Sequence, residues 1–178
     1  MHCQNMRTTE NQPNHPFKRT GSAARHLPFN LGVRLQESKE GATAVLDREG
    51  RTDLHYAIID KNLELAKELI LSQREDINCQ DKSGYTPLHA AAQLGQVEVV
   101  NLLLKQGARL DLVDAWGNTP LSRALGPSQE SREIVRILLE HGVDPSAKNA
   151  SGISVLSHVM KIKTHPNRDQ FEKWLSHG

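Results

Sequence analysis

Apolar residues between positions 81 and 113 recur at the spacing of two short helices. Leu88, Ala91 and Ala92 lie three and four residues apart, so they share one face of a first helix. A second apolar face follows at Val97, Val99, Val100, Leu103 and Leu104. Two short helices that are apolar on more than one side cannot bury that surface alone. The pattern therefore predicts a stack of similar units rather than one central core.

Polar and small residues mark the ends of these two helices. Thr86 is suited to the N-cap, because its hydroxyl accepts a hydrogen bond from a free backbone N–H of the first turn. Pro87 then falls at the first helical position, where its missing N–H costs nothing. Gly95 and Gly107 are placed to end the first and second helix in a left-handed conformation.

The same order of signals divides most of the chain into four units, which begin at Asp47, Asp81, Asp114 and Asn149. The predicted repeats are 47–80, 81–113, 114–148 and 149–178. The first has one extra residue in the turn 72–75, and the third has two within 126–131, between its helices. The fourth keeps little of the pattern, and its predicted second helix, 168–176, is polar except for Phe171, Trp174 and Leu175. A more polar final repeat is typical of a terminal cap, whose outer face is exposed to solvent.

The residues before the repeats have a different composition. Residues 1–36 carry five basic residues against the single acid Glu10, together with three prolines, and predict a flexible basic arm. A transit peptide and an extension from an upstream start codon are alternatives for this arm. Residues 37–46 predict a leading hairpin or a degenerate N-terminal cap, because Gly41-Ala42 echoes Gly107-Ala108.

The motif Thr86-Pro87-Leu88-His89-Ala90-Ala91 matches the Thr-Pro-Leu-His-x-Ala signature of ankyrin repeats, within a unit of about 33 residues. The chain thus resembles the ankyrin-repeat family, with the second and third units closest to the family pattern. The resemblance implies an all-α repeat fold, a short solenoid of helix-turn-helix pairs joined by β-hairpin-like loops. It also implies that His55 and His89 hydrogen-bond the backbone between adjacent hairpins.

Composition and charge limit the classes of partner and the cellular location that we expect. The net charge is +1, which offers no whole-protein argument for nucleic acid or for an acidic membrane as partner. Hydrophobic residues make up 37% and aromatic residues 4%, which suits thin layers of leucine and alanine. Cys3 and Cys79 form no disulfide framework, and no apolar run approaches the roughly 18 residues of a membrane span. We expect a cytoplasmic protein that is a monomer before complex formation.

Common catalytic motifs are missing. Gly152-Ile153-Ser154 begins like a nucleophile elbow but lacks the closing glycine and the preceding strand. The sequence has nine histidines, but they do not form the two closely spaced pairs of ligands that are typical of a zinc site. We therefore expect no metal and no cofactor. The expectation is therefore that the chain is not an enzyme.

In ankyrin proteins the hairpin tips and the exposed side of each first helix form a concave surface that binds another protein. Trp116 is the strongest candidate for a partner-binding residue, because tryptophan is enriched at binding hot spots. The alternative is that Trp116 packs on neighbouring hairpins. Tyr85 and Leu94 complete the predicted apolar centre. The partner-binding residues implied by the resemblance are Arg48, Arg51, Asp60, Lys82, Tyr85, Gln93, Leu94, Trp116 and Asn118.

The basic residues Arg48, Arg51 and Lys82 suit a partner with an acidic patch that faces the first two repeats. The resulting hypothesis is a non-catalytic protein–protein interaction module that acts as an adaptor or inhibitor. An antidote that neutralises a toxin enzyme is the alternative, as is a scaffold whose basic arm makes a second contact. An enzyme with an unrecognised site is a third class.

Overall fold

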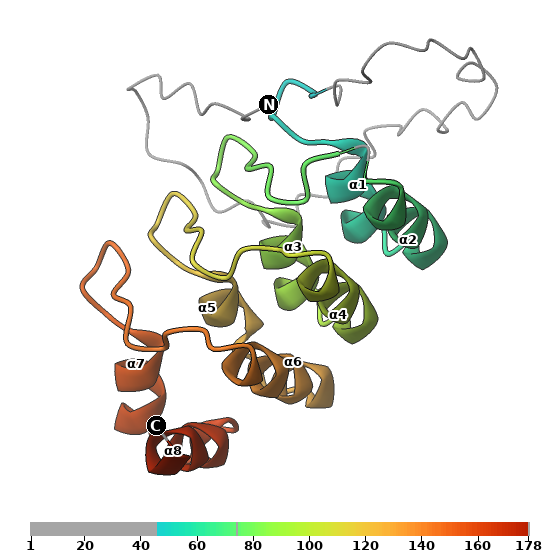
Figure 1. The fold of residues 1–178 in the computed structure, drawn as a ribbon. Helices are drawn as coiled ribbons and strands as arrows, with labels where there is room; N and C mark the ends of the chain where they lie inside the picture. The colour runs from blue at the N-terminus through green and yellow to red at the C-terminus, as the bar shows by residue number, and fades with distance from the viewer. Residues whose placement is uncertain (1–45, 74, 178) are drawn as a thin grey trace, which may run out of the picture.

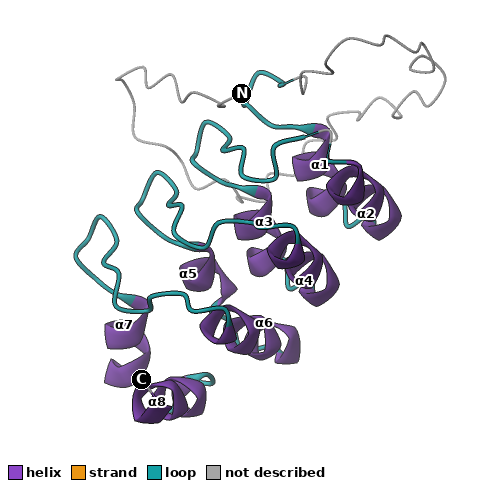
Figure 2. Ribbon diagram, in the orientation of Figure 1, coloured by secondary structure: helices purple, strands orange, loops and turns teal. Residues whose placement is uncertain are grey.

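The computed structural model describes residues 46–73 and 75–177, and in this range it contains eight α-helices. The predicted arm 1–36 lies outside the described residues, as does the leading segment 37–46 except for Leu46. Figure 2 shows that loops connect all the helices. The helices are α1 (Asp53–Ile59), α2 (Leu63–Ser72), α3 (Pro87–Gln93), α4 (Val97–Lys105), α5 (Pro120–Ala124), α6 (Gln129–Glu140), α7 (Val155–Lys161) and α8 (Arg168–His177).

Consecutive helices form four hairpin-shaped pairs that stack side by side (Figure 1). The first helices α1, α3 and α5 pack in one layer, and the second helices α2, α4, α6 and α8 pack in the other. A long loop precedes each of α3, α5 and α7, and these loops project from the same side of the stack (Figure 1). The predicted all-α repeat fold is confirmed. Within the described range the loops form only one isolated β-bridge, between Lys148 and Ser154.

The predicted N-cap Thr86 starts the first helix of the second repeat, and Thr52 starts that of the first. The side chains of Thr52 and Thr86 accept hydrogen bonds from the backbone N–H groups of His55 and His89. Each histidine returns the contact, because its ring nitrogen accepts from the backbone N–H of the same threonine. Two backbone N–H groups at the start of each helix are thereby satisfied reciprocally, as in a capping box.

Helix ends in the second repeat use glycine, as predicted: Gly95 and Gly107 have φ values of +72° and +86°. The first repeat has Lys61 and Gln73 at the corresponding positions, with φ values of +56° and +51°. A non-glycine residue in this left-handed region costs roughly 1–2 kcal/mol. The first repeat is therefore locally strained at both helix ends.

The core is a series of thin layers. Leu54, Leu88 and Leu121, which are equivalent in the first three repeats, are at most 1% exposed. Ala90, Ala91 and Ala92 of α3 are 3% exposed or less, and their small side chains let α1 and α5 approach closely from either side. The layered core of leucine and alanine predicted from composition is confirmed.

The third repeat differs from the prediction in one respect. α5 has only five residues and is followed by Leu125 in an extended conformation. Residues 126–128 lie between the helices, as expected, but α6 already begins at Gln129 and has 12 residues. The inserted residues therefore lengthen α6 as well as the loop, because Ser128 caps the helix by accepting from the backbone N–H of Ser131.

The fourth repeat packs on the third through its second helix. The predicted second helix is present as α8, and Phe171 is completely buried against the core. Trp174 is partly buried, whereas Leu175 is 50% exposed. None of the helices in the described part of the chain has the length and apolar character needed to span a membrane.

Candidate functional site

Each of the four loops contains the same side-chain-stabilised turn. Its first residue is Asp47, Asp81, Asp114 or Asn149, and the Oδ1 atom of this residue accepts two backbone N–H groups, two and four positions further on. All eight of these hydrogen bonds measure 2.8–3.1 Å. A short acceptor side chain at this position is suited to the turn because it reaches its own following backbone. The sequence thus builds four similar hairpins.

Backbone hydrogen bonds join these hairpins into a row. In each case the residue after the aspartate or asparagine donates its N–H to the preceding hairpin. The bonds are Lys82 N to Glu49 O at 2.8 Å, Ala115 N to Ser83 O at 2.8 Å and Ala150 N to Trp116 O at 2.9 Å. The row is therefore fixed by its backbone, and side chains at the tips can vary without disturbing it.

Two histidines tie the first three hairpins together a second time. The Nε2 atom of His55 donates to the carbonyl oxygen of Tyr85 at 3.1 Å, and that of His89 donates to Asn118 O at 3.0 Å. Burial lowers the pKa of both rings, and that of His89 falls to about 4. Both histidines are therefore neutral at pH 7, with the proton on Nε2. The role that the family resemblance implied for them is confirmed.

The third repeat has Ser122 where the second has His89, so this tether stops before the fourth hairpin. Ser122 Oγ instead lies 3.4 Å from Thr119 Oγ1, and Thr119 does not cap α5 with its side chain. Between the third and fourth hairpins the backbone bond to Trp116 O remains, supplemented by Asn149 Nδ2, which donates to Asn118 Oδ1 at 3.2 Å.

Arg123 is a central residue of this surface that sequence reasoning missed. Its guanidinium group donates through Nε to the fully buried carboxylate of Asp114 at 2.8 Å, and through a second nitrogen to the same oxygen. The same group lies 5.0 Å from the centre of the Tyr85 ring and 5.3 Å from that of Trp116. Such cation–π contacts hold the two rings in place. The repeat register offered a signal, since Arg123 occupies the position that the buried Ala90 has in the second repeat.

The structure corrects the predicted role of Tyr85. Its side chain was expected to be part of an apolar contact area, but the residue is only 5% exposed. Arg123 lies over its ring, its hydroxyl donates to Gln93 Oε1 at 2.9 Å, and burial raises the pKa of the phenol to about 12. Tyr85 therefore supports the surface from beneath and offers little area to a partner. Trp116 and Leu94 are half-buried and keep part of their side chains at the surface.

The predicted polar residues fall into two groups. Arg48, Asp60 and Lys82 are exposed and are free to contact a partner. Arg51 donates through Nε to Asp81 Oδ2 at 3.2 Å, and Asn118 accepts from the next hairpin, so both side chains also serve the stack. Gln93 is half-buried beside Tyr85. The structure brings Tyr85 and Trp116 together around Arg123, and Gln93 joins them through its hydrogen bond with Tyr85.

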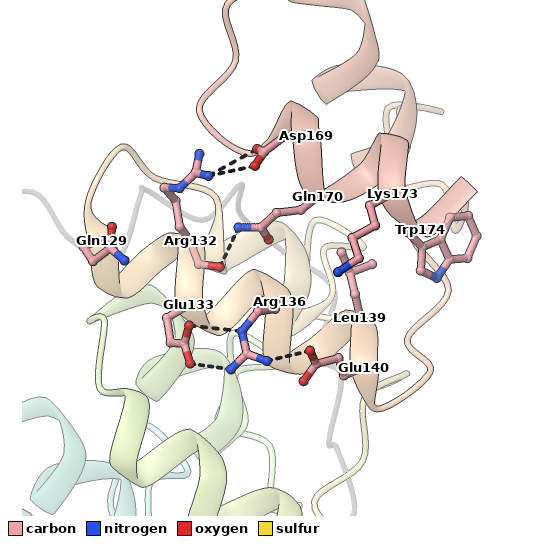
Figure 3. Close-up of a pocket in the computed structure, with 10 residues that line it drawn as sticks. All are labelled: Gln129, Arg132, Glu133, Arg136, Leu139, Glu140, Asp169, Gln170, Lys173 and Trp174. Carbon is pink, nitrogen blue, oxygen red and sulfur yellow. Dashed lines mark hydrogen bonds and ion pairs between the residues drawn. The ribbon is translucent and has the colours of Figure 1, made fainter. Parts of the chain in front are cut away.

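A groove of about 480 Å³ lies between α6 and α8, in the layer of second helices (Figure 3). Ion pairs occupy much of its wall: Arg132 binds Asp169 at 3.0 Å, and Arg136 binds both Glu133 and Glu140 at 2.5 Å. Its remaining lining residues are Gln129, Leu139, Gln170, Lys173 and Trp174. Sequence reasoning gave no indication of this groove.

The described side chains offer no evident metal site. No group of three or more His, Cys, Asp or Glu residues in that part of the chain lies close enough to hold an ion. His158 and His165 do meet edge to face, with their ring centres 5.8 Å apart, but no third ligand joins them there.

Known proteins share this repeat. A family model described as ankyrin repeats, in three copies, matches residues 54–149. The chain belongs to the ankyrin-repeat family. The match runs from α1 to the start of the fourth hairpin, and therefore includes both histidine tethers and Arg123.

Three relatives show the extent of the similarity. The B-cell lymphoma 3 protein homolog of Mus musculus is 34% identical over 128 residues, which cover 70% of this chain and 28% of the relative. The nuclear factor NF-kappa-B p105 subunit of Gallus gallus is 35% identical over 66% of this chain and 13% of the relative. NF-kappa-B inhibitor alpha of Gallus gallus is 39% identical over 54% and 30%. The chain thus spans less than a third of the length of each of these proteins.

Proposed function

We propose that this chain is a non-catalytic module that binds another protein on the surface formed by its hairpin tips and first helices, as an adaptor or an inhibitor. Ankyrin repeats and the relatives support the general role of protein–protein interaction. The observation that carries the proposal is the row of four hairpins, which hydrogen bonds hold at fixed positions while their tips stay exposed. A surface ordered before binding loses little conformational entropy when a partner docks.

Trp116 is the proposed anchor of this surface. The residue is half-buried, and the Arg123 guanidinium group lies against its ring, so part of a large apolar side chain is presented in a fixed orientation. Asp114 in turn holds Arg123. A rigid aromatic side chain surrounded by polar groups is typical of a binding hot spot. Arg48 and Lys82, both exposed, form the polar rim on the side of the first two repeats.

The names of the relatives favour a regulatory role. One of them is named as an inhibitor, NF-kappa-B inhibitor alpha. This similarity supports the inhibitor form of the proposal, in which the hairpin surface covers a functional region of the partner. An adaptor would use the same surface and would leave the partner active.

The test begins with affinity capture and mass spectrometry to identify a partner, whose affinity is then measured for two variants. Trp116→Ala should weaken binding by about 2 kcal/mol, close to 30-fold, as is usual for a truncated hot spot. Leu71→Ala is the matched control, since Leu71 is 59% exposed and belongs to α2 in the other helical layer. Circular dichroism should show that both variants stay folded. Equal affinity of Trp116→Ala and the wild type would contradict the proposed surface.

A further inference from the structure

The end of α7 in the fourth repeat and the turn after it present basic charge that no acidic residue in the described chain compensates. Lys161 and Lys163 are exposed, and neither forms an ion pair with any residue in the described part of the chain. Residues 155–167 contain no aspartate or glutamate. The nearby acids of α8 already have partners, because Asp169 binds Arg132 and Glu172 binds Arg168.

Two exposed isoleucines accompany this charge. Ile153 precedes the N-cap of α7 and is 50% exposed, and Ile162 follows the last residue of α7 and is 39% exposed. Most of the large apolar residues in the described chain are buried or partly buried, so two exposed isoleucines at the ends of one seven-residue helix are unusual. The helix is about 10 Å long, which a peptide of a few extended residues can span.

The repeat register places these side chains on the proposed binding surface. Lys161 and Ile162 are equivalent to Gln93 and Leu94 of the second repeat, at the end of the first helix. Ile153 is equivalent to Tyr85, which the following repeat covers. No further hairpin covers Ile153 within the described residues. We define the terminal patch as Ile153, His158, Lys161, Ile162 and Lys163, all of which are exposed.

We propose that the terminal patch binds an acidic segment of the partner protein in which aspartate or glutamate residues alternate with large apolar residues. The lysines would contact the carboxylates, and the isoleucines would contact the apolar side chains. The inference rests on the proposed function and adds the partner's chemistry to it. It adds a basic contact area in the fourth repeat to the rim of Arg48 and Lys82, because Arg51 of the first repeat is already engaged by Asp81.

The test uses a fluorescently labelled synthetic peptide of alternating glutamate and leucine, with fluorescence anisotropy as the readout. Lys161→Glu/Lys163→Glu replaces two attractions by two repulsions and should weaken binding about tenfold or more at low salt, with a smaller effect at high salt. Lys61→Glu/Lys105→Glu changes the net charge equally, and Lys61 occupies in the first repeat the register that Lys163 has in the fourth. This control should stay within about twofold of the wild type.

Several results would overturn the inference. Equal losses for the two double variants would show attraction by overall charge only. Unchanged binding of Lys161→Glu/Lys163→Glu, or stronger binding of a DNA duplex or of anionic lipid vesicles than of the peptide, would contradict it as well. Replacement of the leucines in the peptide by serine should also weaken binding, because the isoleucines would lose their contacts. If the captured partner depends on Trp116 and not on the lysines, the proposed function stands and the terminal patch fails.

Discussion

Gly117 and Gly152 occupy the same position of two consecutive hairpins but have different surroundings. Both have a φ of +74°, a conformation that side-chain-bearing residues rarely adopt. A Cβ atom added at Gly117 would lie 2.6 Å from the backbone nitrogen of Ala150, whereas a Cβ atom at Gly152 would meet nothing within 4 Å. Comparison of alanine at these two positions therefore separates backbone strain from the close approach of neighbouring hairpins.

The expected magnitudes follow from these contacts. At either glycine, alanine costs roughly 1–2 kcal/mol for the left-handed conformation and regains about 0.4–1 kcal/mol from a less flexible unfolded chain. Gly152→Ala should therefore destabilise the fold by about 1 kcal/mol. Gly117→Ala must also displace the fourth hairpin, which breaks the 2.9 Å bond from Ala150 N to Trp116 O. Loss of this bond adds about 1 kcal/mol, and the disturbed packing adds to it, for a total of about 2–3 kcal/mol.

Urea denaturation followed by circular dichroism measures both differences. The wild type and the two alanine variants should share one slope, so that the midpoints report stability directly. If Gly117→Ala and Gly152→Ala reduce stability equally, the hairpins do not approach each other as the structure shows. Gly84→Ala provides a second test, because its Cβ atom would lie 2.8 Å from Asp114 Cα and should cost as much as that of Gly117→Ala.

Three further predictions concern stability. Leu121→Ala removes a fully buried side chain and should cost about 2–5 kcal/mol in the same urea assay; a loss below about 1 kcal/mol would mean that the leucine is not packed. Because the pKa of His89 is lowered to about 4 in the folded state, only the unfolded state gains a proton as pH falls from about 6.5 to 4, and stability should fall by up to about 3 kcal/mol over that window. His89→Gln should flatten this pH dependence in urea titrations at pH 7.5 and 5, and an unchanged slope would rule out His89 as its source. Ser122→His should restore the missing tether to Ile153 O and raise stability by about 1 kcal/mol, which a higher urea midpoint would show.

Much of the fold was predictable because local signals and packing signals agree. Thr86, Pro87 and Gly95 each favour one helix boundary for a physical reason of its own, and the structure uses all three. The loop between α5 and α6 was less predictable, because Ser128 competes with residues further along as the N-cap. Such a choice depends on how α6 packs, which local sequence does not encode.

The candidate site was predictable as a region but not residue by residue. The register located Trp116 and Lys82 at the hairpin tips, and both keep exposed surface. Whether a side chain in the row faces solvent depends on the residue that the neighbouring repeat sets against it. Tyr85 is covered because Arg123, distant in sequence, is held over its ring by Asp114. A pattern within one repeat carries no information about that contact.

One position of the hairpin is structural in the first three hairpins and lies at the surface in the fourth. This position lies four residues after the aspartate or asparagine that begins each hairpin. It is occupied by Arg51, Tyr85, Asn118 and Ile153. In the first three hairpins this side chain contacts the following repeat, through an ion pair, through a covering arginine or through an amide. No fifth hairpin follows Ile153 in the described chain, and half of its surface is exposed. The side chain at this position is half-buried in Arg51 and Asn118 and buried in Tyr85, so the contact with a following repeat reduces its exposure. Within the described chain, the fourth hairpin is therefore where this position can offer apolar area without the loss of a contact to a following repeat.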